Sequence, residues 1–165
     1  MIEGVKITPL KQIFDERGKV MHMMRADSDV FTQFGEIYFS CTNPGSIKAW
    51  HLHKQMTLNY AAIYGEIKCV LYDDRPNSKT KGCIDEYTLS QENYYLVTVP
   101  PLVWNGFKGI GTKVSIVANC ATIPHDPLEL ERKSAFDSSS PNSFSAFPFI
   151  SMRPSSLRIP IISNG

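Results

Sequence analysis

The hydrophobic positions of the chain fall in short β-branched and aromatic runs, separated by turn residues such as Asn43-Pro44-Gly45 and Gly109-Ile110-Gly111. Many short strands at close spacing are typical of a β-sandwich or barrel. The strands that this pattern predicts cover 5–10, 19–24, 36–41, 47–53, 58–64, 67–72, 84–89, 95–99 and 113–121. Helical periodicity is scarce, and it predicts one short helix over 126–133, with Pro127 near its start.

The composition changes near residue 134. Residues 134–165 are rich in Ser, Pro and Phe and have little periodicity, as in Ser138-Ser139-Ser140-Pro141. We therefore expect one all-β domain over 1–133, followed by an irregular tail over 134–165. The tail is expected to be poorly ordered or to pack on the domain or on a partner subunit. A short strand over 147–150 that pairs with the domain is the alternative.

The charge balance and the hydropathy pattern argue against two kinds of partner. The 165 residues include 17 Lys and Arg against 16 Asp and Glu, which gives a net charge of +1. A nucleic-acid binder would normally carry a basic excess or stripe, so no nucleic-acid partner is expected. No apolar run approaches the roughly 18 residues of a membrane helix, and the first residues lack the pattern of a signal peptide. No membrane partner is expected either.

The four cysteines are widely spaced and include no CxxC pair; they are Cys41, Cys69, Cys83 and Cys120. This spacing argues against zinc-finger and thioredoxin-type sites. Reduced thiols in a cytoplasmic protein are the simpler interpretation.

Candidate chemistry concentrates around two histidines, His51 and His53. Residues two apart share one face of a strand, so His51, His53 and Gln55 point one way. Trp50 and Leu52 point the other way. Polar groups on the inward face of a barrel would line a pocket, so the sequence predicts a pocket at this strand.

These histidines lie in a segment that resembles the first motif of the cupin superfamily: a Gly, five residues, His-x-His, an acidic residue and a later Gly. The matching residues are Gly45, His51, His53 and Gly65. The acidic position falls on Thr57 or Leu58, and the histidine of the second cupin motif falls on Asn105. Catalytic metal sites normally keep at least three protein ligands. The resemblance therefore implies a cupin-type antiparallel β-sandwich (jelly roll) without the cupin metal.

A wider set of motifs resembles the dTDP-4-dehydrorhamnose 3,5-epimerase family, a metal-free branch of the cupins. The matching segments are Asp15-Glu16-Arg17-Gly18, Lys48-Ala49-Trp50-His51, Tyr64-Gly65-Glu66, Asp73-Asp74-Arg75, Val99-Pro100-Pro101, Trp104-Asn105-Gly106-Phe107 and Pro124-His125-Asp126-Pro127. The resemblance implies a metal-independent 3,5- or single-site epimerase of a nucleotide-linked 4-keto-6-deoxy sugar, in deoxysugar and surface polysaccharide biosynthesis. It also implies a homodimer.

Epimerisation beside a ketone needs a base, a group that stabilises the enolate oxygen, and an acid on the far face of the sugar. No metal or redox cofactor is expected, because the ketone supplies the electron sink. By resemblance, His51 is the catalytic base and Asp73 belongs to the catalytic site. The residues expected to bind the substrate are Arg17, Lys48, His53, Asn105 and Asn119. Lys48 stands where the family has an arginine that meets the diphosphate.

Three family positions differ in this chain. The enolate-stabilising Lys of the family falls on Leu58, its catalytic Tyr on Asn119 and its second pocket His on Asn105. Asparagine cannot deliver a proton at neutral pH, so the acid is left open among three nearby tyrosines. These are Tyr38, Tyr60 and Tyr64. The acidic residue that orients the base in the family has no identified counterpart.

Two other functions stay open at this stage. A chain that kept the pocket and lost the chemistry would bind a nucleotide sugar without turnover. A metal-dependent small-molecule cupin would instead recruit a metal through His51 and His53, with help from His125 or Asp126.

Overall fold

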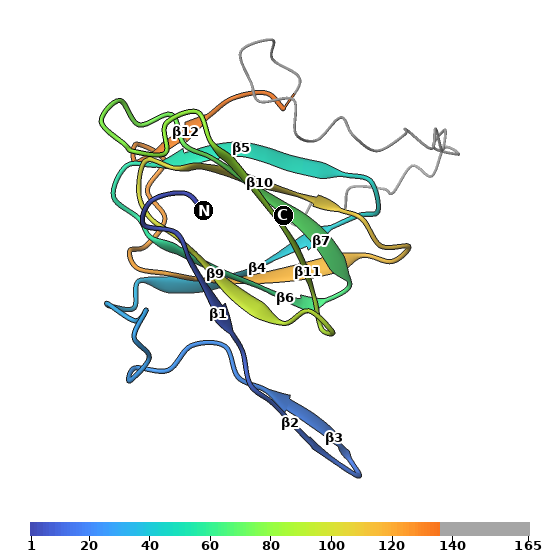
Figure 1. Ribbon diagram of the computed structural model, residues 1–165. Coiled ribbons are helices and arrows are strands. Elements are labelled where there is room, and N and C mark those ends of the chain that lie inside the picture. Colours follow the sequence, from blue (N-terminus) through green and yellow to red (C-terminus); the bar gives the residue numbers. More distant parts are fainter. Residues whose placement is uncertain (136–165) are drawn as a thin grey trace, which may run out of the picture.

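The computed structural model describes residues 1–135, which form two facing antiparallel sheets and a projecting hairpin (Figure 1). The strands are β1 (Lys6–Pro9), β2 (Gln12–Asp15), β3 (Gly18–Met21), β4 (Glu36–Thr42), β5 (Ile47–His53), β6 (Leu58–Tyr64), β7 (Glu66–Tyr72), β8 (Ile84–Ser90), β9 (Tyr95–Val99), β10 (Trp104–Gly109), β11 (Ser115–Ala121) and β12 (Leu130–Arg132). The first sheet has the order β1-β9-β6-β11-β4, and the second has the order β12-β5-β10-β7-β8. This architecture confirms the predicted cupin-type β-sandwich.

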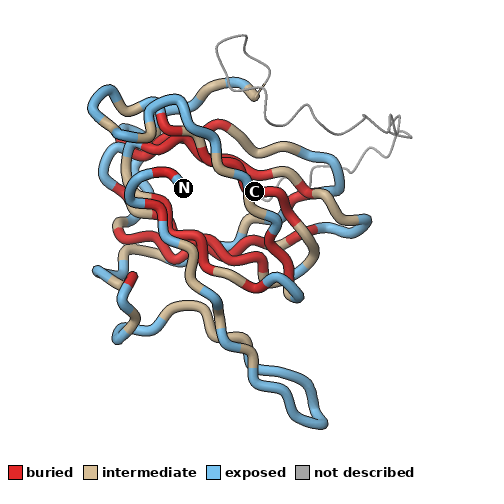
Figure 2. Tube along the Cα trace, viewed as in Figure 1, coloured by how far each residue is buried: buried red, intermediate tan, exposed pale blue. Residues whose placement is uncertain are grey.

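The main hydrophobic core lies between the two sheets, where buried residues line both inner faces (Figure 2). Alternation along β6 shows how the strands divide their side chains. Leu58, Tyr60 and Ala62 join the central core. Ala61 and Ile63 belong to a separate cluster on the other face of this sheet. A third cluster contains residues of β5, β7 and β10, namely Trp50, Leu52, Val70 and Trp104. The faces of β5 are therefore divided between this cluster and the space between the sheets.

A two-stranded hairpin, β2–β3, projects away from the sandwich (Figure 1). Three of its apolar side chains are exposed: Ile13, Phe14 and Val20. The hairpin is almost entirely exposed along its length (Figure 2).

The sequence predicts most strands, and it misses β2, β10 and β12. The predicted strands 47–53, 58–64 and 95–99 coincide with β5, β6 and β9. β10 was missed because Asn105, Gly106 and Gly109 have weak strand propensity. Pairing with β5 on one side and β7 on the other overrides that local preference.

The helix expected over 126–133 is wrong. A turn occupies the first part of this segment, and Leu130–Arg132 form β12. β12 pairs with β5, with Leu130 opposite His53 and Arg132 opposite His51. Tertiary pairing therefore overrides the local helix signal. The predicted tail, from residue 136 onward, and the alternative strand over 147–150 lie outside the described residues.

All four cysteines are free thiols. Cys69 and Cys120 are buried, whereas Cys41 and Cys83 are exposed. Within residues 1–135, no helix has the length and apolar character needed to cross a membrane.

Candidate active site

A cavity of about 460 Å³ opens between the two sheets, and its walls come from opposite sheets. The wall from the first sheet consists of Glu36, Tyr38, Ser40, Tyr60, Val117 and Asn119. The wall from the second sheet consists of Lys48, His51, His53, Phe107, Leu130 and Arg132, joined by His125 from the loop before β12. The volume lies in the range of pockets that bind small molecules.

A bulge in β5 brings a cation to the same wall as the histidines. Lys48 pairs with Phe107 of β10. His51 pairs with Asn105, so three steps along β5 match two steps along β10. Lys48 and His51 would face opposite sides of a regular strand. The extra residue therefore explains why both line the cavity.

Glu129, in the loop before β12, holds His53 in place. Its Oε2 lies 2.6 Å from Nδ1 of His53. Its Oε1 accepts hydrogen bonds from the main-chain N–H groups of Gln55 and Met56, both at 2.8 Å. Burial raises the pKa of the Glu129 carboxyl, but these amides and His53 lower it more, so the net pKa lies below the ordinary value. Since Nδ1 is held by Glu129, Nε2 is the His53 nitrogen left to meet a ligand.

His51 lies beside His53 on the cavity wall, and its ring has no hydrogen-bond partner within residues 1–135. Burial lowers the pKa of His51 to about 4, and the electrostatic influence of Arg132, His53 and Lys48 adds to this effect. The imidazole is therefore neutral at pH 7 and has a lone pair that can accept a proton. An anionic ligand beside Arg132 and Lys48 would offset part of their lowering of the His51 pKa.

On the opposite wall, Asn119 of β11 and Tyr38 of β4 are cross-strand partners. Oδ1 of Asn119 accepts the main-chain N–H of Asn59 at 2.8 Å. Because that N–H can only donate, the NH₂ group of Asn119 faces Tyr38 and donates to its hydroxyl oxygen at 2.9 Å. Burial raises the pKa of the Tyr38 phenol, the Asn119 bond lowers it and Glu36 raises it, and the net pKa is above the ordinary value. Tyr38 therefore keeps its proton at neutral pH.

Asn105, expected to bind the substrate, is buried behind the cavity wall. Its Oδ1 accepts the hydroxyl of Tyr60 at 2.9 Å. Its Nδ2 donates to the main-chain oxygens of His51 and Val103. Both ends of the amide are thus used within the protein, and the placement of Asn105 does not match the expected substrate contact. Burial raises the pKa of Tyr60 well above the ordinary value, and its hydroxyl proton is committed to Asn105.

Cationic groups border the cavity near the imidazoles. Nζ of Lys48 reaches across from the second sheet and donates to Oγ of Ser40 on the first, at 2.8 Å. Arg132 follows on β12, opposite His51 of β5. A further hollow of about 430 Å³ shares three residues with the cavity and is lined by His125, Pro127, Leu130 and Arg132. Lysine and arginine side chains are the usual partners of phosphate groups.

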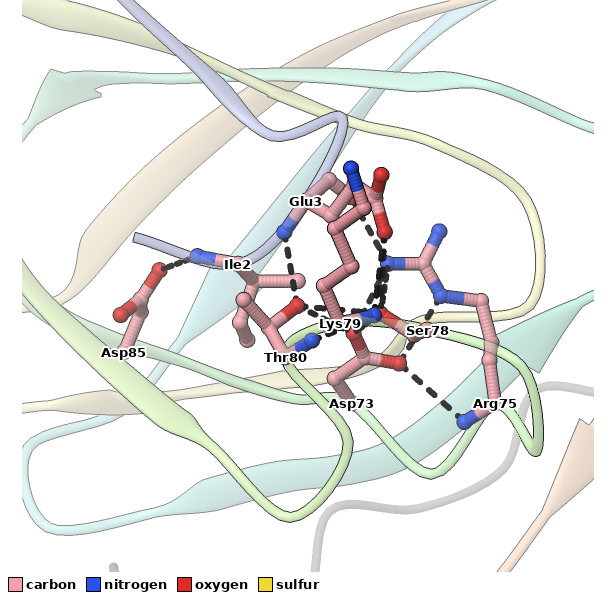
Figure 3. Close-up of polar contacts among 8 residues, drawn as sticks. All are labelled: Ile2, Glu3, Asp73, Arg75, Ser78, Lys79, Thr80 and Asp85. Atoms are coloured by element: carbon pink, nitrogen blue, oxygen red, sulfur yellow. Dashed lines mark hydrogen bonds and ion pairs between the residues drawn. The ribbon is translucent and has the colours of Figure 1, made fainter.

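Asp73, expected in the catalytic site, lies outside the cavity in a polar cluster that anchors the N-terminal segment (Figure 3). Its carboxylate is fully buried and accepts hydrogen bonds from Arg75, Ser78 and Thr80. Arg75 also donates to the main-chain oxygen of Glu3 at 2.7 Å. Arg75 first, then Ser78 and Thr80, hold the pKa of Asp73 well below its usual range against the effect of burial. These contacts give Asp73 a structural role.

Arg17, also expected to bind the substrate, lies at the tip of the β2–β3 hairpin. Its side chain is 82% exposed, and its Nη2 lies 2.7 Å from Oδ2 of Asp15. It does not line the cavity. The expected site residues that the structure brings together are Lys48, His51, His53 and Asn119.

Sequence reasoning does not single out four residues that shape the site. They are Glu36, Ser40, Glu129 and Arg132. The available signal for Glu36 and Ser40 is their spacing of two from Tyr38 along the predicted strand 36–41. Glu129 and Arg132 fall in the segment that was expected to be a helix, so their contacts with β5 could not be inferred.

Metal ligation was one of the alternatives for this site. Within residues 1–135, no group of three or more His, Cys, Asp and Glu side chains is arranged to hold a metal ion. His125 and Asp126, the expected helpers of His51 and His53, complete no such group. The metal-dependent alternative therefore lacks a third ligand in this part of the chain.

The fold and the cavity define a cupin-type protein with a small-molecule site between its two sheets. A model of the dTDP-4-dehydrorhamnose 3,5-epimerase family matches residues 1–138. The chain belongs to this family.

Relatives extend this finding. The chain is 32% identical over 127 residues to a probable low-salt glycan biosynthesis epimerase, Agl13, of Haloferax volcanii. The matched region covers 76% of this chain and 81% of Agl13. It is 32% identical over 133 residues to the spore coat polysaccharide biosynthesis protein SpsL of Bacillus subtilis, covering 81% and 88%. The crystal structure of a dTDP sugar isomerase from Desulfovibrio desulfuricans superposes with a TM-score of 0.86 at 43% identity, covering 89% and 94%.

Proposed function

We propose that the protein epimerises a nucleotide-linked 4-keto-6-deoxy sugar, at C3 and C5 or at one of them, without a metal or redox cofactor. The observation that best supports this proposal is that two imidazoles, His51 and His53, lie on one wall of the cavity. The chain that carries them belongs to this epimerase family. The names of the relatives, a glycan biosynthesis epimerase and a spore coat polysaccharide biosynthesis protein, support a place in deoxysugar and polysaccharide biosynthesis.

His51 is the base that removes the proton from the carbon beside the ketone. Its lone pair is available at neutral pH, and both ring nitrogens lack a protein partner within residues 1–135. Lys48 and Arg132 bind the diphosphate. The bound anion offsets the influence of these two cations on His51, so the imidazole becomes a stronger base when the substrate is present.

His53 supplies a donor for the enolate oxygen, a task that the family gives to the lysine replaced here by Leu58. When both ring nitrogens carry a proton, His53 donates from both of them, and Glu129 balances the charge. Nδ1 meets the Glu129 carboxylate, and Nε2 meets the developing enolate. The competing assignment makes the His53–Glu129 pair the base, because a carboxylate also supports an imidazole that accepts a proton.

We infer that the protein is a homodimer. The exposed apolar side chains of the hairpin support this, as do Ile37 and Phe39 on the edge strand β4. In such a dimer, Arg17 at the hairpin tip of one subunit would reach the cavity of the other subunit. Sedimentation velocity should show a dimer that Phe14→Asp weakens, and a monomeric wild-type protein would contradict the inference. The four free thiols support a cytoplasmic location, where thiols stay reduced.

Deuterium incorporation tests the function. The protein is incubated in D₂O with dTDP-4-keto-6-deoxyglucose, and the sugar is followed by NMR and mass spectrometry. We expect deuterium at C3, C5 or both with the wild-type protein, and a loss of at least about 100-fold in the rate with His51→Ala. Arg25→Ala is the control, because Arg25 is exposed, pairs with Asp27 and does not line the cavity. This variant should keep the wild-type exchange rate.

The outcome separates the open alternatives. Binding of the nucleotide sugar without exchange would favour the non-catalytic alternative. Exchange that survives His51→Ala but not His53→Ala would make the His53–Glu129 pair the base. Neither exchange nor binding would contradict this substrate.

A further inference from the structure

We propose that Tyr38 is the catalytic acid that returns a proton to the sugar on the face opposite the imidazoles. The assignment rests on the proposed epimerase function and deepens it. It moves the acid by one strand, from β11, where the family has its catalytic tyrosine and this chain has Asn119, to the neighbouring strand β4.

Inversion at carbon requires the base and the acid on opposite faces of the sugar ring. His51 and His53 project from β5 of the second sheet, whereas Tyr38 projects from β4 of the first. All three side chains line the same cavity. A sugar ring held between the two sheets therefore meets imidazole on one face and phenol on the other.

The hydrogen bonds leave the proton of Tyr38 available. Its hydroxyl oxygen accepts from Asn119, whose orientation is fixed by the main-chain N–H of Asn59. Within residues 1–135, the Tyr38 hydroxyl has no acceptor for its own proton. The amide donor of Asn119 also stabilises the phenolate that remains after the proton has left. Asn119 is thus a positioning residue, which explains how an asparagine can occupy the family's tyrosine position.

The other two candidate tyrosines do not meet these conditions. The hydroxyl of Tyr60 is fully engaged in donating to Asn105 inside the protein. Tyr64, at the end of β6, is exposed and does not line the cavity. Of the three tyrosines that the sequence left open, Tyr38 combines a place in the cavity with an uncommitted proton.

The proposed step balances. The base has removed a proton from the carbon beside the ketone, which leaves an enolate. The electron pair of the enolate C=C bond forms a new C–H bond with the Tyr38 proton, and the C–O bond returns to a ketone. The O–H bond of Tyr38 breaks. The phenolate then takes a proton from water, and the imidazolium of the base returns its proton to water, so both groups regain their starting protonation states. No oxidant or co-reactant takes part.

The test separates proton abstraction from inversion. Tyr38→Phe removes the acid and leaves the base, so the variant should still exchange a substrate proton for deuterium from the base side. With dTDP-4-keto-6-deoxyglucose in D₂O, we expect exchange within about 10-fold of the wild-type rate, and a loss of about 100-fold or more in the inverted product. Tyr64→Phe, the same change outside the cavity, should keep both rates. Thermal unfolding confirms that each variant is folded.

A second variant tests the orientation by Asn119. Asn119→Asp keeps an acceptor for the Asn59 N–H, but it replaces the donor that faces Tyr38 with an oxygen that accepts the phenol proton. We expect inversion to fall while exchange persists, so the ratio of inversion to exchange drops. A merely structural role would lower both rates together.

Three results would overturn the assignment. Undiminished inversion in Tyr38→Phe would remove the proposed role. Loss of inversion in Tyr60→Phe, with inversion kept in Tyr38→Phe, would transfer the role to Tyr60. A wild-type protein that neither exchanges nor inverts the sugar would instead refute the proposed function for this substrate, and Tyr38 would lose its role with it.

Discussion

Glu129 and His53 are 76 positions apart in the chain, yet Oε2 of the carboxylate lies 2.6 Å from Nδ1 of the imidazole. The same carboxylate caps the turn after β5 through the amides of Gln55 and Met56. One side chain therefore fixes the cavity histidine and ties the β12 segment to β5. This contact therefore stabilises the folded protein and also positions the cavity histidine.

Glu129→Gln should lower the free energy of unfolding at pH 7 by about 1–3 kcal/mol, because a charge-assisted contact to a buried imidazole is lost. The pKa of Glu129 is depressed in the folded protein, so its contribution is present above pH 4.5, its ordinary value. The contribution fades as the pH falls through the folded pKa. Urea unfolding of the wild type and the variant at pH 7 and at pH 4 measures the difference in the free energy of unfolding at each pH. The difference should be smaller at pH 4. Glu131→Gln, an exposed partner of Lys54, is the control and should change stability by less than about 0.5 kcal/mol.

Asp73→Asn should destabilise the protein by about 3 kcal/mol at pH 7, because Arg75 loses its charged partner and a fully buried hydrogen-bonded site loses its anion. The depressed pKa of Asp73 places this contribution above pH 3.8, and acid removes it. Nucleotide-sugar exchange by the folded variant should match the wild type, because Asp73 lies outside the cavity. Lost exchange with unchanged unfolding would instead place Asp73 in the chemistry.

Arg132→Gln should raise the pKa of His51 above its value of about 4, because a nearby positive charge is removed. An NMR titration of the His51 ring in the protein without substrate measures the midpoint. The acid limb of kcat/KM for exchange should move to higher pH in the same variant, since that limb reports the free protein. Arg25→Gln, an exposed change at a residue that does not line the cavity, should leave both midpoints unchanged. A wild-type midpoint at the ordinary 6.5 would contradict the burial of His51.

Gly106→Ala should disturb the bulge of β5. A Cβ at position 106 would lie 2.3 Å from Cβ of Ala49, which is closer than packed carbon atoms tolerate. We expect a loss of about 1–3 kcal/mol in the free energy of unfolding, and slower exchange as Lys48 shifts relative to His51. Gly111→Ala is the matched control, since its Cβ would make an ordinary 3.5 Å contact with Glu66. Equal effects of the two substitutions would contradict the role of the close approach.

The fold could be predicted wherever one strand carries its own signal. β5, β6 and β9 follow from their β-branched and aromatic runs alone. β10 could not be predicted in this way, because Asn105 and Gly106 become strand residues only when two neighbours pair with them. β12 is short and polar, and its register with β5 is a property of the folded chain.

The candidate site divides in the same manner. The His-x-His spacing places His51 and His53 on one face by local geometry. Lys48 lines the cavity because of a bulge in β5, and the residue pattern of this segment does not predict that bulge. Asn105 was expected in the site because of its place in a motif, yet its amide serves Tyr60 and the main chain. The partnership of Glu129 with His53 joins distant segments, and a single sequence carries no trace of it.

The register of Asn119 opposite Tyr38 has a consequence for how such proteins diverge. Cross-strand partners present their side chains to nearly the same volume, so a functional group can pass from one strand to its neighbour while the backbone stays unchanged. A comparison made column by column would score that exchange as the loss of an active residue. In this protein Asn119 and Tyr38 form one such pair of facing positions.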